Sequence, residues 1–175
     1  MRTSNCPTGN ILVLGIGNTL LTDEGAGVRA LERLMERYEF SSNVTLMDGG
    51  TLGVRLLEPM MAADRLVVLD AVRVGGRPGT VHRFTAEDLK STLAGKGSLH
   101  DMGILEALGY AELLDRRPRT VIIGIEPEDF TSWSTSLSDP VQEGLDLMVA
   151  AALLEIRRFG GECRQCAREL AAVAV

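Results

Sequence analysis

Four runs of apolar residues constrain the fold of this chain more than any other feature. They are "ILVLGI" (11–16), "NVTLMDGG" (43–50), "RLVVLDAV" (65–72) and "TVIIGI" (120–125). Continuous apolar character is typical of strands that are buried on both faces, as in a parallel sheet. Helical stretches are expected between and after them, at 25–40, 51–63 (interrupted near Pro59), 85–95, 98–114 and 139–159. This alternation predicts an α/β fold, a three-layer α/β/α sandwich.

A fifth strand is expected at "TVHRF" (80–84). The turn "GRPG" (76–79) joins it to the strand at 65–72, and this connection is too short for a crossover helix. We therefore expect these two strands to pair antiparallel, in a five-stranded and mostly parallel sheet.

Several helix starts carry capping signals. Thr85 begins a T-x-x-D cap, Ser98 precedes the next helix, and Asp139 precedes Pro140 at the start of the longest one. Thr22 or Asp23 is expected to cap the helix at 25–40, and "EPEDFTSWSTSLS" (126–138) is expected to be a polar loop.

Size and charge restrict the classes of function. The 175 residues predict a single domain over 1–175, with a core at about 11–157, a short N-terminal extension and a C-terminal tail. The net charge of −6 argues against nucleic acid as a partner. The chain lacks an apolar stretch of roughly 20 residues and its first ten residues do not form a secretory signal, so we expect no membrane partner and a cytoplasmic protein.

Three cysteines, Cys6, Cys163 and Cys166, lie near the ends of the chain. An odd number argues against a disulfide framework in a cytosolic protein. "CRQC" (163–166) has the spacing of a redox or metal pair, but it lacks a second pair, so we interpret it as an incidental motif of the tail.

The turn after the first strand contains two glycines in a pattern that resembles a dinucleotide-binding turn. The sequence reads Gly15-x-Gly17-x-x-Leu20, with leucine where the third glycine of G-x-G-x-x-G would stand. The acidic pair Asp23-Glu24 follows and would repel a phosphate at the helix start. Asp48 at the end of the second strand keeps a nucleotide-binding hypothesis open.

Acidic residues follow each of the first three parallel strands. Asp23 and Glu24 come after the first, Asp48 ends the second and Asp70 ends the third, while His100 lies near a helix start. All should meet at the carboxyl edge of the sheet. Carboxylates with one imidazole form a mixed site that suits a first-row divalent metal. Each residue alone has a structural alternative: the acids can cap helices or accept backbone N–H groups, and the histidine can be a partly buried residue.

The sequence resembles the hydrogenase maturation endopeptidases, which trim the large subunits of nickel–iron hydrogenases. The resemblance covers about residues 11–157 and rests on four motifs in order: "GIGNTLLTDEGAGV", "DGGTLG" (48–53), "LDA" (69–71) and "SLH" (98–100). It implies that Glu24, Asp70 and His100 are the metal ligands and catalytic residues. Asp23 and Asp48 are then residues that support the ligands or shape the turns.

The resemblance also implies a function. The enzyme would remove a C-terminal extension from the hydrogenase large-subunit precursor once nickel has been inserted, and the substrate would carry that nickel. Zinc or cadmium can substitute for it, and we expect a monomer. The alternative is a non-catalytic nucleotide- or metal-binding module of doubly wound fold.

A mechanism follows as a hypothesis. Three protein ligands leave coordination positions open for substrate and water, and the metal would polarise the scissile carbonyl or lower the pKa of a water. Asp23 or Asp48 is a candidate general base. The sequence offers no credible serine or cysteine nucleophile, because the cysteines are terminal and His82 lies within the strand at 80–84, where we expect a structural role.

Overall fold

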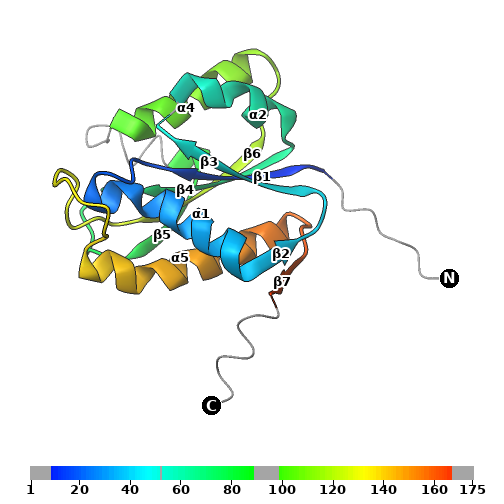
Figure 1. Ribbon diagram of the computed structural model, residues 1–175. Coiled ribbons are helices and arrows are strands. Elements are labelled where there is room, and N and C mark those ends of the chain that lie inside the picture. The colour runs from blue at the N-terminus through cyan, green and yellow to red at the C-terminus, as the bar shows by residue number, and fades with distance from the viewer. Residues whose placement is uncertain (1–8, 52, 89–98, 167–175) are drawn as a thin grey trace.

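The computed structural model describes residues 9–51, 53–88 and 99–166, and the side chains of residues 54 and 99–105 lie outside this description (Figure 1). The elements are β1 (Ile11–Ile16), the 3-10 helix η1 (Thr22–Gly25), α1 (Ala26–Arg37), β2 (Tyr38–Phe40), β3 (Val44–Gly50), the 3-10 helix η2 (Gly53–Leu56), α2 (Leu57–Ala62), β4 (Arg65–Ala71), β5 (Val81–Thr85), α4 (Leu99–Leu113), β6 (Arg119–Ile125), α5 (Asp139–Arg158) and β7 (Cys163–Gln165). No helix in the described ranges combines the length and the apolar character that crossing a membrane requires.

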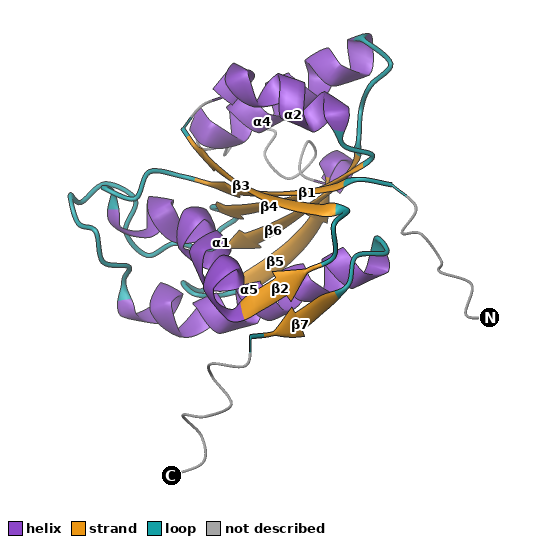
Figure 2. Ribbon diagram, turned by 45° about the vertical axis from the view of Figure 1, so that its right-hand side comes forward, coloured by secondary structure: helices purple, strands orange, loops and turns teal. Residues whose placement is uncertain are grey.

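The main sheet has five strands in the order β3-β1-β4-β6-β5. The first four are parallel, and β5 runs antiparallel to β6. Helices α1 and α5 cover one face of the sheet, and α2 and α4 cover the other (Figures 1 and 2). Every residue of β1 is buried, because a helical layer lies over each face. The predicted three-layer α/β/α fold is confirmed.

The predicted partner of the antiparallel strand is wrong. We expected 80–84 to pair with 65–72, but β6 lies between β4 and β5. Strand β4 has β1 and β6 on its two sides and therefore has no free edge for β5. The connection between β4 and β5 instead passes the end of β6, where Gly79 N–H donates to the Glu126 carbonyl and Glu126 N–H donates to the Thr80 carbonyl.

Two predicted helix limits also differ from the structure. Helix α1 ends at Arg37 because the next three residues form β2, which pairs with β7. Pro59 does not interrupt a helix: it is in the first turn of α2, where a missing backbone donor is tolerated, and the break lies earlier, between η2 and α2.

Of the predicted helix caps, one is confirmed, one lies outside the described residues and one is shifted by a residue. Thr85 and Asp88 form the expected reciprocal cap, with Thr85 N–H donating to Asp88 Oδ2 at 2.9 Å and Asp88 N–H to Thr85 Oγ1 at 3.2 Å. Residues 86–88 are helical, while the remainder of the predicted helix at 85–95 and the Ser98 cap lie outside the described residues. The N-cap of α5 is Ser138, one residue before the predicted Asp139.

The tail takes part in the fold as far as Cys166. Phe159 is buried, β7 pairs antiparallel with β2, and Cys166 N–H donates to the Arg37 carbonyl. An extended chain separates Cys163 from Cys166 by roughly 10 Å, at about 3.3 Å per residue. A disulfide needs Cα atoms within about 7 Å, so "CRQC" in this conformation is not a disulfide pair.

Helix α1 lies directly against the sheet because Gly27 has no side chain. A Cβ atom at Gly27 would be 2.1 Å from the Leu69 carbonyl oxygen and 2.4 Å from that of Ile16. The first turn of α1 is therefore held at the carboxyl ends of β1 and β4, the edge where the acidic residues were predicted to meet.

We predict that Gly27→Ala lowers the free energy of unfolding by about 3 kcal/mol, because the added methyl group forces α1 away from the backbone of two strands. Gly109→Ala in α4 is the matched control: a Cβ there has no neighbour within 4 Å, so alanine should stabilise the helix by about 0.5–1 kcal/mol. Urea unfolding followed by circular dichroism measures both, and equal effects would contradict this account of α1.

Candidate metal centre

The glycine turn after β1 is filled by the backbone of the chain itself. Gly17 has a φ of +129°, and a Cβ atom there would lie 1.7 Å from the Glu24 carbonyl oxygen. The turn thus folds η1 back onto the end of β1. Because the Glu24 carbonyl occupies this space, Gly17 cannot approach a pyrophosphate as the glycines of a dinucleotide-binding turn do.

Glu24 and Asp70 are both buried at the carboxyl edge of the sheet. Glu24 lies in η1 and is 5% exposed, and Asp70 is the next-to-last residue of β4 and is 4% exposed. The two elements contact each other. Side chains alternate along a strand, so Asp70 is on the same face as Val68, which packs in the core with α2 and α4. Asp70 Oδ1 also accepts a hydrogen bond from Ala71 N–H at 2.8 Å.

His100 belongs to the first turn of α4, and its side chain lies outside the described residues. Helix α4 ends at Leu113, shortly before β6 starts at Arg119, so α4 runs opposite to the parallel strands. Its first turn is therefore at the carboxyl edge, on the face that Asp70 occupies (Figure 1). Among the residues whose side chains are described, no three His, Cys, Asp or Glu residues lie close enough together to hold a metal ion. The side chain of His100 does not belong to that set.

The donor set of these residues suits a divalent transition metal. Glu24 and Asp70 offer carboxylate oxygens and His100 offers an imidazole nitrogen. Such a mixture is typical of zinc and nickel sites rather than of calcium or magnesium sites, which use oxygen alone.

Asp48 accepts a backbone N–H group, which is the structural role that the sequence analysis gave as the alternative to metal binding. Its side chain is exposed, and Oδ1 accepts a hydrogen bond from Gly50 N–H at 2.8 Å. This bond shapes the turn after β3.

Asp23 is completely buried and does not cap α1, contrary to one prediction. The N-cap of α1 is Gly25, without a side-chain hydrogen bond. Oδ2 of Asp23 instead accepts from Glu128 N–H (2.9 Å), Asp129 N–H (2.9 Å) and the Ser138 hydroxyl (2.8 Å), and Oδ1 accepts from Ser138 N–H (2.8 Å). With four donors on its two oxygens, this carboxylate is a poor general base. Its partners are more than 100 residues away, so no local pattern predicted them.

The residues around Asp23 fix the same loop, residues 126–138, to η1. Thr22 Oγ1 donates to the Ser132 carbonyl (2.8 Å), Thr22 N–H donates to the Ser134 carbonyl (2.9 Å) and Ser134 N–H donates to the Leu20 carbonyl (3.0 Å). Thr22 adopts a φ of +34°, which β-branched residues rarely do. Such a conformation persists only where surrounding contacts enforce it, as these hydrogen bonds do.

Glu126 is a buried residue at this edge that sequence reasoning missed. Its carboxylate accepts from Val74 N–H and Gly75 N–H, both at 3.0 Å, and so holds the connection between β4 and β5. His82 Nε2 lies 3.9 Å from Glu126 Oε2, and the His82 ring stacks on Phe84. As with Asp23, the partners are backbone groups, which leave no signal in the sequence.

Loop 126–138 is acidic. Hydrogen bonds from the Ser132 hydroxyl and from the N–H groups of Thr131 and Ser132 lower the pKa of Asp129 to about 2. Because this pKa is depressed, the stabilising bonds are complete above the ordinary value near 3.8 and are lost only as the pH falls through about 2. The loop is thus negatively charged at neutral pH.

We predict that Asp23→Ala lowers the free energy of unfolding by about 3 kcal/mol, because a buried carboxylate is removed and three partly buried backbone N–H groups lose their acceptor. Amide hydrogen exchange at Glu128, Asp129 and Ser138 should accelerate more than at α5. Asp48→Ala removes a single exposed hydrogen bond and should cost about 1 kcal/mol or less. Unchanged exchange in the loop of Asp23→Ala would show that its carboxylate does not hold the loop.

Comparison with known proteins adds an independent observation. A family model described as hydrogenase maturation protease matches residues 28–155. The hydrogenase expression/formation protein HupD of Rhizobium leguminosarum bv. viciae is 41% identical over 156 residues, which cover 88% of this chain and 77% of that protein. The hydrogenase 2 maturation protease of Escherichia coli K12 is 34% identical over 154 residues, covering 87% and 93%. Among solved structures, the hydrogenase maturating endopeptidase HybD from E. coli matches with a TM-score of 0.85 and 32% identity, covering 91% of this chain and 99% of that one.

Proposed function

Because the chain belongs to the hydrogenase maturation protease family, we propose that it removes the C-terminal extension of a nickel–iron hydrogenase large-subunit precursor after nickel insertion. The chain is an endopeptidase, a hydrolase of peptide bonds, as its relatives are. The proposal adds two parts to this: the bond that is cut lies before a C-terminal extension, and nickel insertion precedes the cleavage.

Glu24, Asp70 and His100 are the residues that we propose to bind the nickel carried by the substrate. The observation that supports this best is the burial of two carboxylates from sequence-distant elements at one edge of the sheet. The first turn of α4 at the same edge supports the inclusion of His100.

In this proposal the protein holds the precursor by the metal that the precursor brings. A divalent ion bound there supplies polarisation of a carbonyl or activation of a water. Glu24 and Asp70 would orient the cleavage segment, and fixing reactants in place can account for much of the rate. Asp23 is left out of the proton transfers because its oxygens bind loop 126–138.

The competing hypothesis is a module that binds a metal or a nucleotide without catalysis. A thermal-shift screen distinguishes a nucleotide-binding module from the proposed metal-binding endopeptidase. We expect nickel, zinc or cadmium to raise Tm, by the equivalent of about 2.7 kcal/mol at a hundredfold excess over Kd. NAD and ATP should have no effect, because backbone fills the glycine turn at Gly17. A Tm increase with NAD but not with nickel would favour the nucleotide form.

Cleavage of the precursor tests the function directly. We expect the wild-type protein to release a C-terminal peptide, detected by mass spectrometry, from nickel-loaded precursor and not from nickel-free precursor. Glu24→Gln, Asp70→Asn and His100→Ala should each lose at least about 100-fold in rate, since even residues that only support metal ligands are worth 10–100-fold.

Asp48→Asn is the control, since it changes an exposed carboxylate at the same edge and should retain the wild-type rate. Full activity of the three folded site variants would refute the assignment of the ligands. Equal cleavage of loaded and nickel-free precursor would refute the role of nickel while leaving the endopeptidase activity in place.

A further inference from the structure

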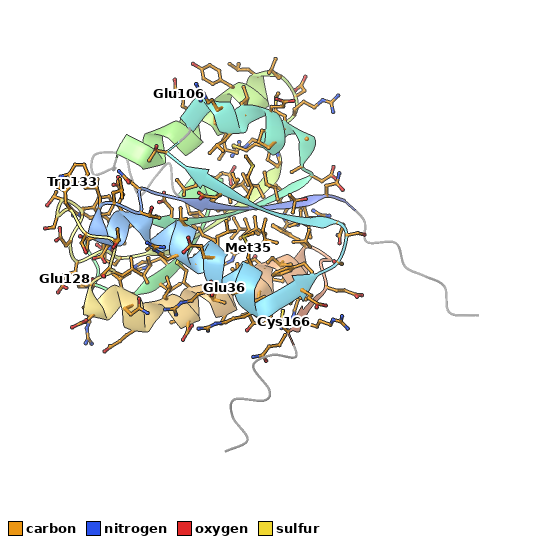
Figure 3. All side chains as sticks on the ribbon, viewed as in Figure 1. Met35, Glu36, Glu106, Glu128, Trp133 and Cys166 are labelled. Carbon is orange, nitrogen blue, oxygen red and sulfur yellow. The ribbon has the colours of Figure 1, made fainter. Side chains whose placement is uncertain are left out.

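Trp133 is the single tryptophan of the chain and is 80% exposed. It lies in loop 126–138, at the end of the molecule where α1 begins (Figure 3). Both of its neighbours are bound to the turn before α1: the Ser132 carbonyl accepts from Thr22 Oγ1, and Ser134 exchanges backbone hydrogen bonds with Leu20 and Thr22. The backbone that carries the indole is therefore fixed before any partner arrives.

Leu20 is a second exposed apolar side chain at this position, at 52% exposure. Leu21 and Ser134 form a parallel bridge, so Leu20 and Trp133 are neighbours in register on adjoining segments. A rigidly held tryptophan beside a leucine loses little conformational entropy on binding, and such residues supply most of the affinity in protein interfaces.

The surroundings of this pair are acidic. Residues 127–139 contain Glu128 and Asp139, which are exposed, and Asp129, which is partly exposed, and no lysine or arginine. The described arginines that contact the loop are engaged: Arg29 binds the Thr135 carbonyl and Glu32, and Arg73 lies over the Phe130 ring. A partner that covers Trp133 would complement this surface with an apolar residue and basic neighbours.

The pair is continuous with the candidate metal centre. Thr22, which binds the residues on both sides of Trp133, is two positions from Glu24 in η1, about 4 Å of rise along a 3-10 helix. Asp23, between them, holds the other parts of the loop. A segment bound at Trp133 therefore lies within a few residues of the site where cleavage is proposed.

We propose that Trp133 and Leu20 form the docking platform for the precursor, and that the platform receives a basic segment of the large subunit with an apolar residue at its centre. This inference rests on the proposed function, because it takes the occupant to be the substrate. The acidic residues around the pair, Glu128, Asp129 and Asp139, attract the basic segment and set its direction, and the indole of Trp133 covers its apolar residue.

Steady-state kinetics on nickel-loaded precursor test the platform. Trp133→Ala should raise KM roughly 30-fold and leave kcat within about twofold, as expected for an interface residue that takes no part in the chemistry. The KM of Trp133→Phe should lie between the KM of the wild type and that of Trp133→Ala. Leu113→Ala is the matched control, because Leu113 is equally exposed at 80% but lies at the far end of α4.

A second measurement does not depend on cleavage. Protein containing 5-fluorotryptophan has one ¹⁹F resonance, which reports Trp133 alone. Precursor should shift or broaden this resonance, and raising the salt from 50 to 500 mM should weaken the effect because exposed charges are screened. Glu128→Lys should weaken binding more than Glu32→Lys, which changes a partly exposed acid on α1.

The outcomes separate the two proposals. Cleavage by the wild type with an unchanged ¹⁹F resonance, or with an unaltered KM in Trp133→Ala, would overturn the platform and leave the function intact. A shifted resonance without cleavage would keep the platform and overturn the function. A precursor that neither binds nor is cleaved would overturn both.

Discussion

The carboxylate of Asp23 holds together the end of the molecule where function is proposed. It accepts four hydrogen bonds from residues 128, 129 and 138, and it does so from within η1, beside Glu24. Removing a charged group from water is costly, and the donors of the loop and of the start of α5 compensate for that cost. The positions of Glu24, loop 126–138 and the start of α5 are thereby linked to a single side chain.

Close backbone packing makes this arrangement possible. Gly17 and Gly27 allow η1 and α1 to touch the ends of β1 and β4, and the unusual φ of Thr22 turns the chain between them. A side chain at Gly17 would push the backbone of Glu24 away from the end of β1, and one at Gly27 would push α1 away from β1 and β4. The glycine turn thus brings acidic residues to the edge of the sheet, where a dinucleotide-binding turn would bring phosphate.

Much of the fold was predictable because its signals are local. The apolar runs of β1, β4 and β6 and the Thr85–Asp88 cap depend on neighbouring residues, and the structure has all of them. The partner of β5 was not predictable, because it depends on which strand already occupies the other side of β4. The roles of Asp23 and Glu126 were hidden for a related reason: both bind distant backbone N–H groups, which every residue but proline offers. Glu24 and Asp70 were predicted as strand-end acids, and both are buried at that edge. Their role as metal ligands, which the motif resemblance implies for them and not for Asp48, stays a prediction.

Two buried carboxylates, Asp23 and Glu126, anchor the two segments that border the site, and almost all of their donors are main-chain groups. Such anchors specify the path of a segment without specifying its side chains. Side chains displayed along these segments, Trp133 among them, can therefore be replaced without changing the path of the main chain, so the surface that meets a client is free to vary while the fold beneath it stays the same.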